Sequence, residues 1–261
     1  MPAIFLPDLR LNARLDGPQD GPPLVFLHAL GTDLTLFDPL VAAFPRHRIL
    51  RLDLRGHGAS DVPDPPYAMG ALIRDVERVI DHFALRDTVL LGVSLGGLIA
   101  QGLAVKRLDL VRALVLSNTA ARIGHASQWE DRIKTVQQDG LAAQIEPTMA
   151  RWFGRIWQDN PAMPALRDQM SKTDPRGWIG CARAIAGTDF YETTATLRLP
   201  TLAIAGGNDG STPPDLVRET ADLIPGSQLA LIQRAGHLPM AERPAEYAAV
   251  LDAFLTRIGH G

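Results

Sequence analysis

The stretch from residue 89 to residue 100 constrains the fold more than any other part of this sequence. A run of β-branched residues and leucine stops at Gly92, and a second apolar run, of helical length, follows Ser94. This order predicts a strand, a sharp turn and a helix, with Gly-x-Ser-x-Gly at the turn. The glycines give a strained turn room, so the Ser94 hydroxyl should stand clear of the sheet. There it lies at a helix N-terminus, where negative charge is favoured.

Two other interpretations of this turn exist. The serine is also a common N-cap of an ordinary strand-to-helix turn. A phosphate-binding loop of the dinucleotide type fits less well, because Gly92, Ser94 and Gly97 break the Gly-x-Gly-x-x-Gly order. The buried strand before the serine and the apolar helix after it favour a nucleophile.

Short apolar runs of strand length recur along the chain and alternate with helical patterns. The predicted strands are residues 24–27, 49–53, 89–91, 113–116, 201–205 and 228–232. A strand or hairpin is expected within residues 3–15, and amphipathic helices are expected around residues 72–83 and 244–258. This alternation predicts an α/β fold with a mostly parallel sheet and helices on both faces.

The strand pattern is absent from residues 122–187. That stretch instead has helical spacing, four tryptophans and four prolines: Trp129, Trp152, Trp157, Trp178, Pro147, Pro161, Pro164 and Pro175. Several short helices broken by proline would explain it. We therefore expect a helical cap, residues 122–187, inserted into a core formed by residues 1–121 and 188–261.

Composition limits the possible partners. The 261 residues have a formal net charge of −3, which gives no case for binding nucleic acid or an anionic membrane. No apolar run approaches membrane-spanning length, and the N-terminal one is too short for a signal peptide. The single cysteine, Cys181, excludes an internal disulfide framework and suits a reducing compartment. These features predict a cytoplasmic protein that acts on a small molecule, and they do not indicate its oligomeric state.

A serine nucleophile needs a base, and the base needs an orienting acid. Ligands of open α/β sheets bind beyond the carboxyl ends of the strands, so the partners should follow later strands. Asp209 follows the predicted strand at 201–205, and His237 follows the one at 228–232. Taken alone, the aspartate is typical of a turn and the histidine of a loop. Together with Ser94 they predict a catalytic triad in the order serine, aspartate, histidine.

The predicted chemistry is acyl transfer. His237 takes the proton of Ser94, which attacks an ester or lactone carbonyl, and water then releases the acyl group. The backbone N–H groups of Leu30 and Leu95 are expected to form the oxyanion hole. His28 and His57 lie on loops near this edge and are expected to be structural. No cluster of His, Cys, Asp and Glu has metal-ligand spacing, so we expect neither a metal nor a cofactor.

These motifs resemble the α/β-hydrolase superfamily. The matching stretches are residues 28–31, 53–60, 92–96, 207–209 and 236–237. The predicted cap, at residues 117–124, 129–133, 151–153 and 177–185, is similar to that of the 3-oxoadipate enol-lactonases. Residues 30–34 and 212–214 fit the same family. The resemblance implies opening of 3-oxoadipate enol-lactone to 3-oxoadipate, in the β-ketoadipate route of aromatic degradation. His28 and Ala29 depart from its pattern, which has asparagine and serine there.

The implied lactone carries a carboxylate, so its pocket should offer a cation or several N–H donors. The cap supplies four arginines, Arg122, Arg132, Arg151 and Arg183, and indole donors at Trp129 and Trp152. Of these side chains, the predicted contacts are Trp129, Arg132 and Trp152. Other activities on the same machinery remain open: carboxylesterase, C–C bond hydrolase and perhydrolase. A ligand-sensing relative without turnover is a further alternative, and the complete triad argues against it. A nucleotide-binding protein is a more distant alternative.

Overall fold

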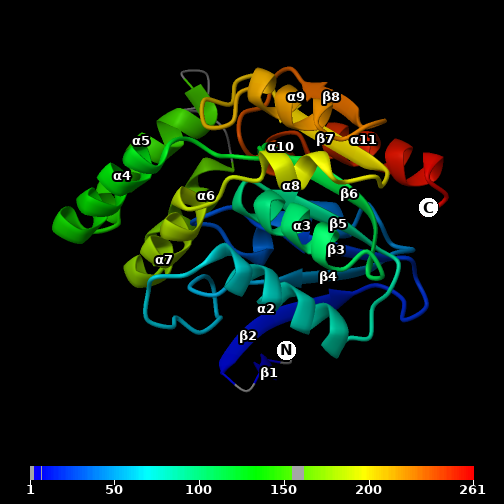
Figure 1. The fold of residues 1–261 in the computed structure, drawn as a ribbon, viewed down its shortest axis with the longest axis horizontal. Coiled ribbons are helices and arrows are strands. Elements are labelled where there is room, and N and C mark those ends of the chain that lie inside the picture. Colours follow the sequence, from blue (N-terminus) through cyan, green and yellow to red (C-terminus); the bar gives the residue numbers. More distant parts are fainter. Residues whose placement is uncertain (1–2, 7, 155–161) are drawn as a thin grey trace.

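The computed structural model describes residues 3–6, 8–154 and 162–261, whose strands form one eight-stranded sheet (Figure 1). The strands are β1 (Ala3–Leu6), β2 (Leu9–Asp16), β3 (Pro23–Leu27), β4 (Arg48–Leu52), β5 (Thr88–Val93), β6 (Val111–Ser117), β7 (Thr201–Gly206) and β8 (Gln228–Ile232). Each strand predicted from the sequence is present. The expected hairpin is the antiparallel pair β1–β2.

The sheet order is β1-β2-β4-β3-β5-β6-β7-β8. β2 pairs with β1 and β4 in antiparallel fashion, and every pair from β4 to β8 is parallel. Every residue of β5 and of β7 is buried, as expected for strands covered on both faces. The predicted, mostly parallel α/β sheet is confirmed. Because β3, β5, β6, β7 and β8 run in one direction, the loops that follow them meet at one edge.

The core helices cover both faces of the sheet (Figure 1). They are η1 (Leu34–Phe37), α1 (Asp38–Val41), α2 (Met69–His82), α3 (Leu95–Lys106), α9 (Pro214–Asp222), α10 (Pro239–Glu242) and α11 (Pro244–Arg257). α3 is buried over nearly its whole length because it packs against β5 and β6 and is covered by α2. Within the described part of the chain, no helix is long and apolar enough to cross a membrane.

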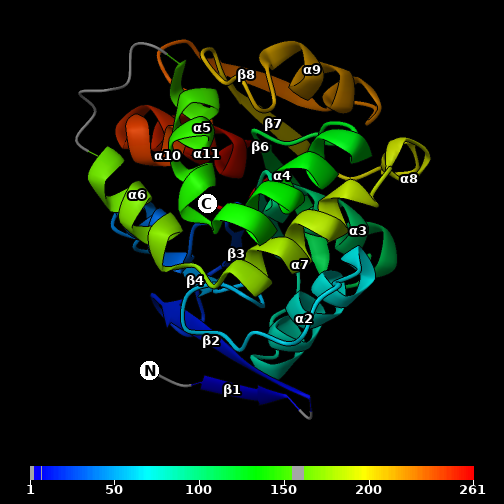
Figure 2. The ribbon, with the colours of Figure 1, turned by 90° about the vertical axis from the view of Figure 1, so that its left-hand side faces the viewer.

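A helical insertion separates β6 from β7, as predicted. It consists of α4 (Ala126–Asp139), α5 (Ala142–Phe153), α6 (Met163–Lys172), α7 (Pro175–Ala186) and α8 (Tyr191–Ala195). α4 contacts α5 and α7, and α5 contacts α6, which gives the layer that faces the viewer in Figure 2. α8 packs on α3 of the core instead. We therefore propose to keep the cap at residues 122–187, with α8 assigned to the core.

The prolines of the insertion behave differently from one another. Pro164 and Pro175 lie in the first turns of α6 and α7, where the missing N–H costs nothing. The expectation that Pro147 breaks a helix is wrong, because it lies inside α5. There it costs one backbone hydrogen bond, while the buried side of the helix keeps its packing through Thr148 and Trp152. Trp157 and Pro161 lie outside the described residues.

Candidate active site

Ser94 occupies the sharp turn between β5 and α3. Its backbone has φ 54° and ψ −112°, in the positive-φ region that residues other than glycine rarely adopt. The turn is possible because its flanking glycines lack side chains. A Cβ on Gly92 would lie 2.2 Å from the carbonyl oxygen of Gly96, and one on Gly96 would lie 2.2 Å from that of Leu27. The serine is 8% exposed and opens into a cavity.

Asp209 and His237 are paired at the same edge of the sheet. His237 Nδ1 lies 2.7 Å from Asp209 Oδ2, and both side chains are buried. The same carboxylate oxygen accepts hydrogen bonds from Asn118 Nδ2 at 2.9 Å and from Thr212 Oγ1 at 2.7 Å. Burial acts to raise the pKa of Asp209, but His237 and these hydrogen bonds hold it below its ordinary value. The carboxylate is therefore ionised and fixed in place at neutral pH.

The loop that carries His237 is held on both sides. Glu242 accepts the backbone N–H groups of Gly236 and Leu238 through its buried carboxylate, with nitrogen-to-oxygen distances between 2.8 and 3.1 Å. The His237 N–H donates to the carbonyl oxygen of Trp152 at 2.8 Å. The Trp152 ring also stacks on the imidazole, with centroids 5.2 Å apart. The insertion therefore helps to orient the imidazole.

A cavity of about 360 Å³ lies between the core and the insertion. Its wall contains six of the eight predicted site residues: Leu30, Ser94, Trp129, Arg132, Trp152 and His237. Asp209 lies behind His237, and Leu95 follows the serine. Among the described residues the Ser94 hydroxyl makes no hydrogen bond to His237. Such bonds often align only when substrate is bound.

Two backbone N–H groups are available next to Ser94. Those of Leu30 and Leu95 donate to no other group in the described chain, which suits an oxyanion hole. The Leu30 turn is held from below, because Gly31 N donates to His57 Nε2 at 2.9 Å. His28 Nε2 accepts from Leu54 N at 2.9 Å, and both histidines are buried. Each histidine thus holds a loop backbone, and neither lines the cavity.

Two guanidinium groups line the cavity, those of Arg132 and Arg151. Neither Arg132 nor Arg151 forms an ion pair with any residue that the structure describes. Arg132 lies over the ring of Trp129 at 4.2 Å and over that of Trp178 at 5.4 Å. Burial, followed by the charge of Arg151, lowers the pKa of Arg132 to about 9, so it stays charged at neutral pH. The cavity therefore carries positive charge.

The structure places all three predicted cap residues, Trp129, Arg132 and Trp152, at the cavity wall. Trp129 lines the cavity, but its indole N–H donates to the carbonyl oxygen of Ile123 at 2.7 Å, so the expectation of a free donor is wrong. Arg151, one of the four candidate cap arginines but not one of the predicted contacts, also lines the cavity. Its signal was helical spacing, because Thr148, Arg151 and Trp152 lie on one face of α5 and all line the cavity.

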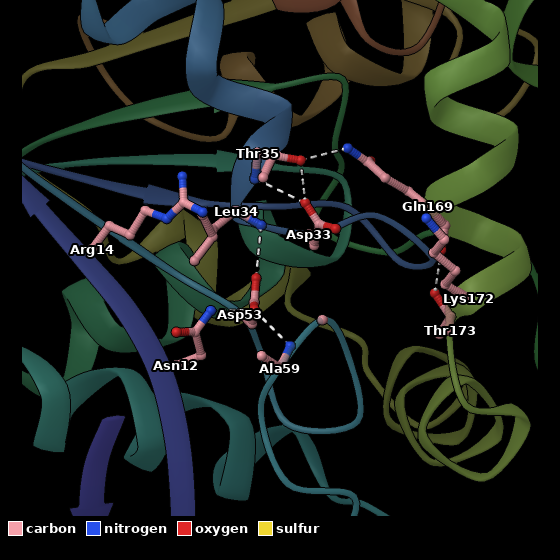
Figure 3. Close-up of a pocket in the computed structure, with 11 residues that line it drawn as sticks. Asn12, Arg14, Asp33, Leu34, Thr35, Asp53, Ala59, Gln169, Lys172 and Thr173 are labelled. Atoms are coloured by element: carbon pink, nitrogen blue, oxygen red, sulfur yellow. Dashed lines mark hydrogen bonds between the residues drawn. The ribbon is translucent and has the colours of Figure 1, made fainter. Parts of the chain in front are cut away.

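A second cavity, of about 280 Å³, also lies between the core and the insertion, against α6 (Figure 3). It shares no lining residue with the cavity of Ser94. Asp53 accepts three hydrogen bonds there, from Asn12 Nδ2 at 2.7 Å and from the N–H groups of Leu34 and Ala59 at 2.8 Å each. Lys172 pairs with Asp168 at 2.6 Å. We name this the polar cavity.

Comparison with known proteins agrees with this geometry. A model of the alpha/beta hydrolase family matches residues 24–250, so the chain belongs to that family and is a hydrolase of this fold. It is similar to the 3-oxoadipate enol-lactonase 2 of Acinetobacter baylyi, with 30% identity over 96% of this chain and 94% of that one. A solved enol-lactonase from Burkholderia xenovorans LB400 is 31% identical, with TM-score 0.94 and coverage of 98% and 100%. A hydrolase of Pseudomonas aeruginosa PA01 is 34% identical, with TM-score 0.92 and coverage of 97% of each chain.

Proposed function

We propose that this chain hydrolyses a small lactone or ester that bears a carboxylate, and that 3-oxoadipate enol-lactone is its substrate. The relatives named as enol-lactonases support the reaction. The observation that carries the proposal is the charge of the cavity, where Arg132 and Arg151 lie near Ser94 without an acidic partner among the described residues. An unpaired, partly buried charge is costly, and a bound carboxylate would offset that cost.

Acylation would begin at His237. Because Nδ1 faces Asp209, the other ring nitrogen, Nε2, is left to act as the base. It would take the proton of the Ser94 hydroxyl as the oxygen attacks the lactone carbonyl. The N–H groups of Leu30 and Leu95 would stabilise the oxyanion, and each such donor typically lowers the barrier by about 3 kcal/mol.

Collapse of the tetrahedral intermediate would open the ring. The bond between the carbonyl carbon and the ring oxygen breaks, and the leaving enol oxygen takes the proton held by His237. The enol stays attached to the acyl chain and becomes the ketone by tautomerisation. A water molecule, deprotonated by His237, then attacks the acyl carbon and releases the acid from Ser94.

The test is the loss of enol-lactone absorbance over time with three proteins. The wild type should turn the lactone over, and Ser94→Ala should lower kcat by about 10⁴-fold or more. Ser211→Ala is the matched control, because it removes another hydroxyl from the same cavity and should stay within about threefold of wild type.

Two results would contradict the proposal in different ways. Near-normal turnover by Ser94→Ala would rule out the serine mechanism. Wild-type activity on 4-nitrophenyl acetate without any on the enol-lactone would leave a carboxylesterase of another specificity.

A further inference from the structure

Among the described residues the cavity wall carries two cations, one more than the proposed substrate needs. The enol-lactone bears a single carboxylate, yet Arg132 and Arg151 both line the wall. Arg151 Nη2 donates to the neutral Thr148 Oγ1 at 2.9 Å, and within the described ranges no carboxylate pairs with either guanidinium. Burial lowers the pKa of Arg151, and burial together with Arg151 lowers that of Arg132. Both cations would therefore be stabilised by an anion.

The two arginines are held by different elements of the insertion. Arg132 stacks on indole rings of α4 and α7. Arg151 belongs to the segment of α5 that contacts the acid and base loops, since its carbonyl oxygen accepts from Gly210 N at 2.8 Å. The next residue, Trp152, stacks on the imidazole of His237. Arg151 is therefore the cation whose backbone is bonded to the loop of the acid and whose neighbour stacks on the base.

Hydrolysis creates a new negative charge at the acyl carbon, beside the Ser94 oxygen and the His237 imidazole. Breakdown of the acyl-enzyme breaks the bond between the acyl carbon and Ser94 Oγ and forms one between that carbon and the oxygen of water. One proton of the water returns to Ser94 through His237. The other is lost to solvent, because a carboxylic acid ionises well below neutral pH. The product then has two carboxylates, one more than the substrate.

We propose that Arg151 forms a second anion subsite, which binds the carboxylate created by hydrolysis while Arg132 binds the one already present in the substrate. This inference rests on the proposed function for the identity of the product. It predicts that the cavity prefers dicarboxylates to monocarboxylates of equal length, and that Arg151 governs product affinity more than substrate affinity.

The test is calorimetric binding of adipate and of hexanoate, which share six carbons and differ by one carboxylate. We expect the wild type to bind adipate at least about tenfold more tightly than hexanoate, as for one additional charged hydrogen-bonded pair. Arg151→Gln should bind both acids with nearly equal affinity, and Arg151→Lys should restore part of the preference. Arg183→Gln is the matched control, because this cap arginine pairs with Glu130 outside the cavity and should bind like wild type. Thermal melts establish that the variants are folded.

Several outcomes would overturn the subsite. One is wild-type affinity of Arg151→Gln for adipate; another is an equal loss for both acids, which would mean a single anion site at Arg151. A rise in the lactone KM of Arg151→Gln as large as its loss of adipate affinity would also contradict the division of roles. Binding needs no turnover, so an adipate preference that depends on Arg151 in a protein inactive on the lactone would support the subsite and reject the proposed function.

Discussion

The two cavities between the core and the helical insertion differ in the partners of their charged groups. In the polar cavity (Figure 3), the Asp53 carboxylate receives three hydrogen bonds from the chain itself, and Lys172 has a carboxylate partner. In the cavity of Ser94, Arg132 and Arg151 contact only aromatic rings and neutral polar groups in the described part of the chain.

We interpret this difference as a distinction between charges that stabilise the fold and charges that a bound ligand would compensate. A charge whose partners come from the chain stabilises the loops that supply them. A partly buried charge without such partners raises the free energy of the free protein and is compensated when an anion binds. Size would not distinguish the cavities, because their volumes are about 280 and 360 Å³.

The largest difference between the cavities is expected when each loses a buried carboxylate. Asp209→Asn should lower kcat on the enol-lactone by about 10⁴-fold, because the amide no longer fixes the His237 tautomer or stabilises its imidazolium. Asp53→Asn is the matched variant in the polar cavity and should change kcat by less than about tenfold. Steady-state kinetics on folded protein measures both, and similar losses would remove the functional distinction.

A smaller effect is expected when each cavity loses a cation. Arg132→Gln should lower kcat/KM for the enol-lactone by about 10- to 100-fold, the worth of a hydrogen bond to a charged group. Arg14→Gln, in the wall of the polar cavity, should leave kcat/KM within about threefold of wild type. Equal effects of the two substitutions would show that Arg132 has no special role in binding.

The polar cavity should instead govern stability. Asp53→Asn turns a carboxylate oxygen that accepts N–H groups into a donor, so the free energy of unfolding should fall by about 1–3 kcal/mol. Urea unfolding checks this value. Lys172→Gln is the control, and it should lower the free energy of unfolding by at most about 0.5 kcal/mol because its ion pair is exposed. Unchanged stability of Asp53→Asn would show that its three hydrogen bonds are dispensable.

The buried His57, which accepts a hydrogen bond from the Leu30 turn through Gly31 N, should make the stability of the protein sensitive to acid. Burial, and then the neighbouring His28, lower the pKa of His57 from 6.5 to about 3. Between these values the unfolded chain binds the proton and the folded protein does not. The contribution of the neutral His57 to the free energy of unfolding is therefore fully present above pH 6.5. It falls as the pH drops toward 3, by about 1.4 kcal/mol per pH unit.

Urea unfolding from pH 7 to pH 4 measures this slope. His57→Gln keeps an acceptor for Gly31 N without the titrating group, and should show a shallower slope. An identical slope in the variant would mean that other groups cause the loss.

Much of the fold could be predicted because its central strands, β3 to β7, are buried on both faces and so appear as continuous apolar runs. The insertion was visible as a loss of that pattern. The short helices η1, α1 and α10 were not predicted, because four residues are too few to show a helical period. The continuity of α5 through Pro147 depends on packing that the sequence does not display.

The candidate site likewise has a part that could be predicted from the sequence and a part that could not. Ser94, Asp209 and His237 were predicted because parallel strands bring their following loops to one edge. The support for this triad, from Asn118, Thr212 and Glu242, depends on side-chain directions that no spacing reveals. Which cap arginines line the cavity also depends on tertiary contacts.

Two cap arginines outside the cavity illustrate this dependence. Arg183 is neutralised by Glu130, which lies 53 residues away in the chain, and Arg122 lies 3.5 Å from Asp189. Arg132 and Arg151 find no such partner in the part of the chain that the structure describes. Local sequence does not distinguish these outcomes.

The most direct test of the proposed anion-binding cavity at Ser94 compares two esters of equal length on the wild-type protein. Mono-4-nitrophenyl glutarate carries a carboxylate, and 4-nitrophenyl pentanoate does not. We predict that kcat/KM for the glutarate ester is larger by about tenfold or more, because its carboxylate binds a guanidinium that has no acidic partner among the described residues. Equal values, or a preference for the pentanoate ester, would contradict a cavity built for anionic substrates.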